Sequence, residues 1–232
     1  HRAGGEYYPK LLCAVPFTPA SGPRLLVRPD ADPDLADVLI RGMIQLAQKI
    51  GLSSLHINFL NPEQFRRCAD NGMLLRVGRQ FHWENRDYQT FDDFLGDLSS
   101  RKRKAIRKER RAVAESGVEL KIITGDELTE EHWDAFFRFY RDTTDRKWGQ
   151  RYLTRRFFSL LGDRMGDRVA LVLAITDGAY VGGALNLIGD DTLFGRYWGS
   201  TEDYKFLHFE ACYYRAIDFA IERGLKWVEA GA

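Results

Sequence analysis

The sequence has few of the residues from which disulfides and metal centres are built. Its three cysteines, Cys13, Cys68 and Cys212, lie far apart and include no Cys-x-x-Cys pair. This pattern excludes a disulfide framework and favours a reducing compartment, so we expect a cytoplasmic protein. The five histidines are scattered, without a His-Glu-x-x-His or Cys/His spacing, and we therefore expect no metal site.

The sequence also lacks long apolar runs and a strong net charge. No apolar stretch approaches the roughly 18 residues that a membrane span needs, and we see no signal peptide. The 34 basic and 33 acidic side chains give a net charge of +1, so no global field indicates a partner. Because the chain begins with His1 rather than methionine, we expect a fragment, and its composition indicates no oligomeric state.

The most informative stretch that is present covers residues 204–232. An apolar arc at helical spacing predicts a helix over residues 207–223 that packs on a sheet. The arc comprises Phe209, Cys212, Tyr213, Ala216, Ile217 and Ala220. Gly224 follows where a helix needs a left-handed cap, and Trp227 starts a strand. A helical crossover joins parallel neighbours, so this strand should lie parallel to the strand that enters the helix.

A repeat links this stretch to an earlier one. Residues 43–59 align with residues 216–232, and Gly51 and Leu52 match Gly224 and Leu225. The earlier helix is expected from Pro33 to Ile50 with Asp32 as its N-cap, followed by a strand over residues 53–60. The repeat predicts a duplicated domain whose first copy has lost its front half.

The chain from Gly117 onward has a clear order of elements. A strand over 117–124 precedes a helix from Thr129 and a shorter helix, and strands follow over 169–175, 180–188 and 192–200. The aromatic face of the first helix predicts core, and the Gly182–Gly183 pair predicts a bulge or a close backbone approach. With the final helix and strand, this order predicts an α/β (α+β) fold with a mixed sheet.

Residues 91–115 predict one long helix with acidic residues at its front and basic residues at its back. Residues 101–111 contain eight lysines or arginines in eleven positions. A solvated face is one interpretation; a phosphate-binding patch for a nucleotide tail, a tRNA acceptor end or an anionic lipid precursor is the other. The candidate phosphate-binding residues are Arg101, Arg103, Lys104, Arg107 and Lys108.

Three strings carry a resemblance to a known family: YYPKLLCAVPFTPASGPRLL over 7–26, SSRKRKAIRKERR over 99–111 and LHFEACYYRAIDFAIERGLKWVEAGA over 207–232. The chain resembles the FemAB-like proteins, which are predicted bacterial acyltransferases of peptidoglycan biosynthesis or recognition. They are similar to the Fem-type peptidyltransferases and, more distantly, to leucyl/phenylalanyl-tRNA protein transferases. The family normally continues beyond residue 232 with a Gln-Gly-Glu-His-Lys segment.

The resemblance implies tandem GNAT-like (acyl-CoA N-acyltransferase) domains, the first incomplete. Residues 1–90 would hold the end of the first domain, 91–116 a basic connecting helix and 117–232 the second domain. The implied activity is transfer of an acyl or aminoacyl group to a small-molecule or peptide amine. Acyl-CoA or aminoacyl-tRNA would be the co-substrate, with no tightly bound cofactor. The loop over 200–208 has no glycine, which argues against ordinary acetyl-CoA binding and for a different donor such as aminoacyl-tRNA.

Candidate site residues lie at strand ends and helix starts. Glu229 is a candidate general base or amine anchor, although an ion-paired edge carboxylate would look the same, and His208 is a candidate base or a helix cap. The candidate substrate-binding residues are Asn58, His82, Trp83, Asn85, Tyr197, Trp198, Tyr204, Lys205 and Glu210, of which Trp83 also fits a core position. The alternative to an enzyme is a non-catalytic module that binds RNA or an anionic cell-wall precursor.

Overall fold

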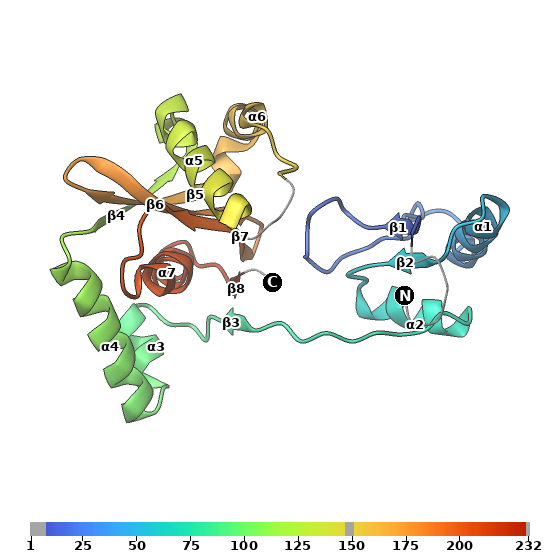
Figure 1. Ribbon diagram of the computed structural model, residues 1–232. Helices are drawn as coiled ribbons and strands as arrows, with labels where there is room; N and C mark the ends of the chain where they lie inside the picture. The colour runs from blue at the N-terminus through green and yellow to red at the C-terminus, as the bar shows by residue number, and fades with distance from the viewer. Residues whose placement is uncertain (1–7, 147–150, 231–232) are drawn as a thin grey trace, which may run out of the picture. The chain divides into compact units, whose positions relative to one another are not determined.

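The computed structural model describes residues 8–146 and 151–230, which fall into two compact units divided between Arg79 and Gln80 (Figure 1). The first unit contains β1 (Leu11–Cys13), α1 (Leu35–Lys49), β2 (Leu55–Ile57) and α2 (Pro62–Asp70), and β1 pairs with β2 in parallel. Its core forms where Leu25 and Ile40 pack with Cys68.

Two local predictions for the first unit need correction. The N-cap of α1 is Asp34, because the Asp32 carboxylate accepts the Asp34 amide at 2.9 Å and holds a turn before the helix. The strand expected over 53–60 is only three residues long, since its single strand neighbour β1 is equally short. The Asn61 side chain caps α2 by accepting a hydrogen bond from the Gln64 amide at 2.8 Å.

A six-stranded mixed sheet in the order β3-β8-β7-β6-β5-β4 forms the centre of the second unit. Its strands are β3 (His82–Glu84), β4 (Glu119–Thr124), β5 (Val169–Thr176), β6 (Ala179–Ile188), β7 (Thr192–Ser200) and β8 (Trp227–Glu229). Every pair is antiparallel except β7 and β8, which confirms the predicted parallel crossover. A Cβ on Gly183 would lie 3.0 Å from Leu173, so the predicted close approach is also confirmed.

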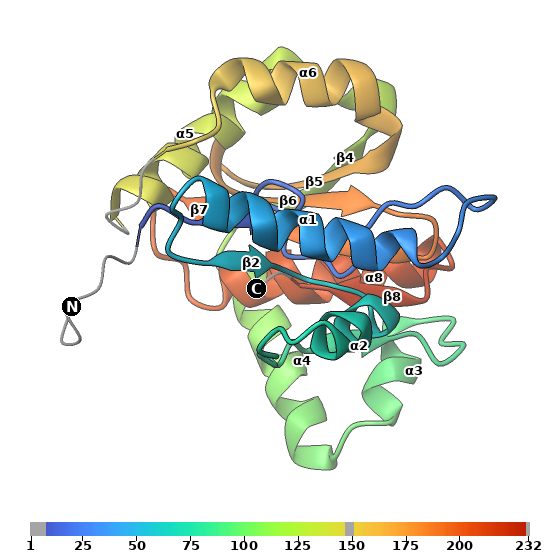
Figure 2. The ribbon, with the colours of Figure 1, turned by 90° about the vertical axis from the view of Figure 1, so that its right-hand side faces the viewer.

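Helices cover both faces of this sheet (Figures 1 and 2). One face carries α5 (Glu130–Arg146) and α6 (Arg155–Met165), flanked by the 3₁₀ turns Gly125–Glu127 and Gly166–Arg168. The other face carries α7 (Leu207–Phe209), a π-helix (Glu210–Tyr214) and α8 (Arg215–Glu222), with α3 (Phe91–Gly96) and α4 (Ser100–Glu115) beside them. The aromatic residues of α5 pack in the core as expected: Trp133, Phe136, Phe139 and Tyr140 are buried.

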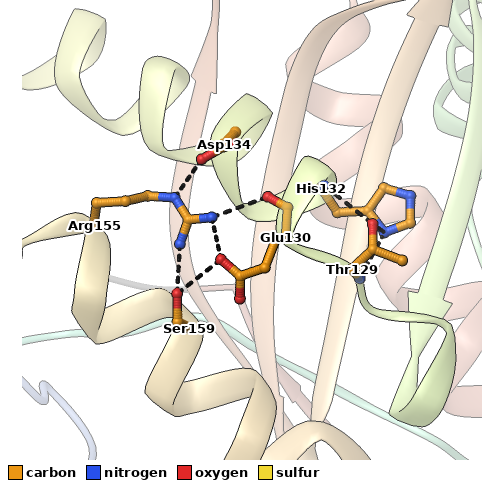
Figure 3. Close-up of polar contacts among 6 residues, drawn as sticks. All are labelled: Thr129, Glu130, His132, Asp134, Arg155 and Ser159. Atoms are coloured by element: carbon orange, nitrogen blue, oxygen red, sulfur yellow. Dashed lines mark hydrogen bonds and ion pairs between the residues drawn. The ribbon is translucent and has the colours of Figure 1, made fainter.

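A polar clamp joins α5 to α6 at the start of both helices (Figure 3). The Arg155 guanidinium donates to Asp134 and Glu130, each at 2.6 Å, and to the Ser159 hydroxyl at 2.8 Å. Ser159 in turn donates to the same Glu130 carboxylate at 2.9 Å. These contacts hold α6 against α5, so that both helices stay packed on the same face of the sheet.

The single long helix expected over residues 91–115 is wrong, because the chain breaks into α3 and α4. A capping box at Thr90 closes the start of α3, and the extended backbone at Ser99 separates the two helices. Arg107 of α4 then pairs with Asp92 of α3 at 2.8 Å. The acidic residues of α3 and the basic residues of α4 therefore belong to two helices and form an ion pair between them. The prediction instead placed them at opposite ends of one helix dipole.

The apolar arc predicted for residues 207–223 holds only in part. Phe209 is 47% and Tyr213 37% exposed, whereas Glu210, which lies outside the predicted apolar arc, is 3% exposed. The π-helix explains the error, since its wider turn shifts the phase of every side chain before α8 relative to a 3.6-residue wheel. Ala216, Ile217 and Ala220 are buried as expected.

Gly224 and Gly51 end their helices in the same way. Both have a positive φ, 65° and 67°, that suits glycine. The Leu225 amide donates to the Ala220 carbonyl at 2.8 Å, and the Leu52 amide donates to that of Ala47 at 2.9 Å. The local match agrees with the repeat. The duplication of a whole domain stays a prediction, because the first unit pairs only two strands among its described residues.

Candidate active site

A cleft opens in the second unit beside the last paired residues of β7 and β8, Phe194 and Glu229. The cleft has a volume of about 210 Å³. Its lining includes Asn186 of β6, Arg196, Tyr197 and Trp198 of β7, and His208 and Tyr213 of the helix that follows. Of the predicted site residues, the structure therefore brings together Tyr197, Trp198 and His208.

A β-bulge shapes the β7 side of the cleft. Leu185 faces Tyr197 and Asn186 faces Gly195, so Arg196 is an extra residue in β7 without a partner in β6. A side chain at Gly195 is excluded, because a Cβ there would lie 2.9 Å from the Ala230 carbonyl carbon. Bulges bend a strand and change the direction of its side chains, and this bulge comes shortly after Phe194, the last residue of β7 that pairs with β8.

Aromatic rings form the opposite wall. The His208 ring centroid lies 5.6 Å from that of Trp198 and 5.8 Å from that of Tyr213, which in turn lies 5.8 Å from Phe209. The series runs from the buried sheet to the exposed Phe209. Cys212 also lines the cleft, but burial raises the pKa of its thiol well above the ordinary range, so the thiol stays protonated.

Glu210 lies behind this wall rather than in the lining. Its Oε1 lies 3.2 Å from the guanidinium nitrogens of both Arg110 and Arg215, and Arg110 also pairs with Asp218 at 2.6 Å. Burial raises the pKa of Glu210 although Arg110 and Arg215 lower it. Because Arg110 belongs to α4, this cluster ties the wall of the cleft to the basic helix.

Glu229 contacts His82 at the end of the parallel strand pair. The two residues face each other in the antiparallel register of β3 and β8, and His82 Nδ1 lies 3.6 Å from Glu229 Oε1. Alternation along β8 places Glu229 on the sheet face opposite Val228, whose side chain packs beneath α8. Glu229 also directly precedes Ala230 of the cleft lining, so it lies beside the cleft.

The other predicted substrate-binding residues lie elsewhere. Trp83 packs edge-on against Phe94 in the core. The Asn85 side chain accepts a hydrogen bond from the Tyr88 amide at 2.8 Å, which holds a turn, and donates to the Leu225 carbonyl at 3.3 Å. Tyr204 packs on a buried cluster before α7, and exposed Lys205 lies 5.1 Å from the Phe206 ring. Asn58 belongs to the first unit, where its carbonyl accepts the Arg24 side chain at 2.9 Å.

The basic helix α4 has two different faces. Arg103 and Arg107 face α3, donating to the Gly96 carbonyl at 3.4 Å and to Asp92 at 2.8 Å. Arg101, Lys104, Lys108 and Arg111 follow the spacing of one helical face and are exposed. Within residues 8–146 and 151–230, no carboxylate forms an ion pair with any of these four. The outward cations are thus the ones available to an external anion.

Sequence reasoning missed Arg196, Asn186 and Tyr213 as cleft residues. Arg196 reaches the cleft through a bulge that depends on the register with β6, and Tyr213 through the π-helix. Asn186 is buried and donates to the Ala170 carbonyl at 3.2 Å. The one signal in the sequence was a single asparagine within an apolar strand. A buried side-chain amide needs hydrogen-bond partners, so such a residue is a candidate for a polar site.

The arrangement of the sheet and its helices defines the structural class of the protein. It is a mixed α/β fold in which a meander leads through a helical crossover to a parallel strand. Several solved structures share it. The L-PGS of Bacillus licheniformis has a TM-score of 0.60 and 10% identity, covering 85% of this chain and 58% of that one. The C-terminal domain of a putative lysylphosphatidylglycerol synthetase from Agrobacterium fabrum has a TM-score of 0.59 and 12% identity, covering 85% and 60%.

FemX has the same fold, with a TM-score of 0.54 and 13% identity, covering 93% of this chain and 73% of that chain. The model of the FemAB-like family, described as peptidoglycan biosynthesis or recognition, matches residues 1–232. The chain therefore belongs to the FemAB-like family, as its three strings indicated. No curated protein matches the sequence.

Two further findings concern the residues that the structure describes. None of their helices combines the length and the apolar character that crossing a membrane requires. Nor do three or more histidine, cysteine or acidic side chains among them gather in a way that would hold a metal ion.

Proposed function

We propose that this protein transfers an acyl or aminoacyl group to an amine in the β7–β8 cleft, within peptidoglycan or lipid biosynthesis. The family description and the folds of FemX and L-PGS support this reaction class. The observation that carries the proposal is the bulge at Arg196 of β7, which lies in one cleft lining with His208 of the crossover helix.

The chemistry follows from what amide formation requires. An amine must lose its proton as it attacks the donor carbonyl, and the carbonyl oxygen becomes an oxyanion. Arg196, the bulge residue of β7 without a partner in β6, supplies a peptide N–H as the oxyanion donor. His208 accepts the proton from the amine. Glu229, beside the cleft, attracts the amine in its cationic form.

The outward face of α4 serves as the site for phosphates of the donor. Lys104 and Lys108 lie one turn apart and are exposed, and the loop over 200–208 offers no glycine-rich cradle for CoA. Aminoacyl-tRNA therefore fits better than acetyl-CoA as the donor. The same face also supports a second candidate function, a non-catalytic module that binds RNA, and turnover separates the two.

Assays on the full-length protein test the transfer. We expect His208→Gln to lower kcat by about 10²-fold or more in an assay of aminoacyl-tRNA deacylation and CoA release across a substrate panel. His132→Gln is the control, because His132 interacts with Thr129 at the start of α5 and is not part of the cleft lining. Absence of turnover in the unsubstituted protein, or equal kcat in both variants, would refute the catalytic role.

Charge reversal tests the donor site separately. Lys104→Glu and Lys108→Glu should each weaken tRNA binding and reduce the salt slope by about one ion per lost contact. Lys121→Glu on β4 is the control, because Lys121 is exposed but already lies 3.5 Å from Glu119. Unchanged binding by both α4 variants, or an equal loss with the control, would remove the phosphate role from this face.

A further inference from the structure

The bulge residue Arg196 carries a charge that the described chain does not neutralise. Its side chain is half-buried in the cleft lining, yet no carboxylate among the described residues forms an ion pair with it. The half-buried Arg110, Arg155 and Arg215 have carboxylate partners. The half-buried Arg24 and Arg103 donate to backbone carbonyls, whereas Arg196 has neither kind of partner among the described residues. A partly desolvated cation without a counter-ion is costly, and an anion that enters the cleft would offset that cost.

The contacts of Arg196 hold the guanidinium without cancelling its charge. Its Nη2 donates to the Tyr197 hydroxyl at 3.2 Å, and its guanidinium carbon lies 4.8 Å from the centre of the Tyr197 ring. The Tyr197 hydroxyl also shares a hydrogen bond of 3.0 Å with that of Tyr152. Burial and this hydrogen bond raise the pKa of Tyr152 to about 12, so Tyr152 is neutral near pH 7.

We infer that Arg196 forms an anion subsite that binds a carboxylate or a phosphate group of the substrate in the cleft. A planar guanidinium pairs with either group through two parallel hydrogen bonds, and one edge on Tyr197 leaves other N–H groups for a ligand. The subsite rests on the proposed function in taking the cleft as the substrate site. The Arg196 subsite adds a preference to that function: the cleft selects substrates that carry an acidic group near the reacting carbonyl or amine.

The two sources of such an anion differ in chemistry. A carboxylate would come from a peptide-like acceptor, and a phosphate from a nucleotide-bearing donor or precursor. N-acetylalanine and inorganic phosphate stand for these sources, and N-acetylalanine amide is the uncharged counterpart of the first. The Arg196 side-chain Nε–H signal in a ¹⁵N-resolved NMR spectrum, assigned by its loss in Arg196→Gln, reports on binding at this site.

We expect the Nε–H signal to shift and saturate with at least one of the two anions and not with the amide. Arg196→Gln should weaken that binding by about tenfold or more, read from neighbouring cleft amides, while Arg196→Lys should retain part of it. Arg223→Gln is the matched control, because Arg223 also lies over a ring, that of Phe219 at 5.1 Å, but outside the cleft lining. Backbone spectra of all variants verify the fold.

The outcomes are decisive in both directions. Saturation with N-acetylalanine alone assigns the acceptor, and saturation with phosphate alone assigns the phosphate-bearing substrate. No saturation with either anion, equal affinity for the amide, or undiminished affinity in Arg196→Gln would overturn the subsite. Anion binding without any transfer activity would instead refute the proposed function and leave the subsite standing, so the two failures are distinguishable.

Discussion

Substitutions at the buried cluster behind the cleft should have unequal effects. Glu210→Gln removes a charge that is 3% exposed and leaves Arg110 with its partner Asp218 at 2.6 Å. Arg215 keeps access to water, because its side chain is 37% exposed. Arg110→Met, by contrast, leaves the Glu210 carboxylate buried with only one of its two cations.

The magnitudes follow from this asymmetry. Removing one partner of a fully buried pair costs about 3–5 kcal/mol of unfolding free energy, whereas removing the desolvated charge itself is often nearly neutral. Since Arg215 stays 3.2 Å from Glu210 and the Arg110 side chain is 25% exposed, we expect about 2–4 kcal/mol for Arg110→Met. For Glu210→Gln we expect less than about 1 kcal/mol, and the double variant should recover part of the loss.

The pH dependence has a definite sign. Burial raises the pKa of Glu210 above its ordinary 4.5, so the folded state binds this proton more tightly than the unfolded state. The resulting stability is fully present below the ordinary pKa and is lost as pH rises through the raised value. The unsubstituted protein should therefore lose stability relative to Glu210→Gln as pH rises above the ordinary pKa of 4.5.

Urea unfolding followed by tryptophan fluorescence measures both effects, because the chain has five tryptophans. The reasoning is refuted if Glu210→Gln costs more than Arg110→Met, or if the stability difference between Glu210→Gln and the unsubstituted protein has the opposite trend with pH. It is also refuted if the double variant is less stable than Arg110→Met alone.

Three further predictions concern other parts of the second unit. Gly195→Val should lower the unfolding free energy by about 1–3 kcal/mol in urea titrations, since its Cβ would meet the Ala230 backbone at 2.9 Å; a neutral effect would contradict the close approach. Arg155→Met should cost about 1 kcal/mol, and less at high salt, because its partner Glu130 is 63% exposed; a salt-independent loss would contradict an electrostatic clamp. Cys212 should react with a thiol reagent only on unfolding, and rapid labelling of the folded protein at neutral pH would contradict its raised pKa.

Much of the second unit could be predicted because its local signals agree with its packing. The strands expected over 169–175, 180–188 and 192–200 are all present as β5, β6 and β7. Gly224 ends its helix where the sequence placed a cap. In these places short-range periodicity and turn chemistry determine the structure without help from distant residues.

The candidate site was less predictable because its geometry comes from departures from regular structure. The π-helix turns Phe209 outward and Glu210 inward, and a helical wheel assumes that no such turn exists. The bulge at Arg196 depends on the register between β6 and β7, which no local pattern contains. His208 and Trp198 could be expected near each other because both lie close to where β7 ends and the crossover helix begins.

The two faces of α4 make ligand affinity and folding separately adjustable. Arg107 and Arg110 hold the helix in place through carboxylates of the same unit, so their substitution affects the fold. Lys104 and Lys108 form no ion pair with a carboxylate among the described residues. Charges at these exposed positions can therefore be added, removed or reversed with little loss of unfolding free energy. Substitutions on the outward face of α4 can therefore change the affinity for an anionic substrate without any change in the hydrophobic core.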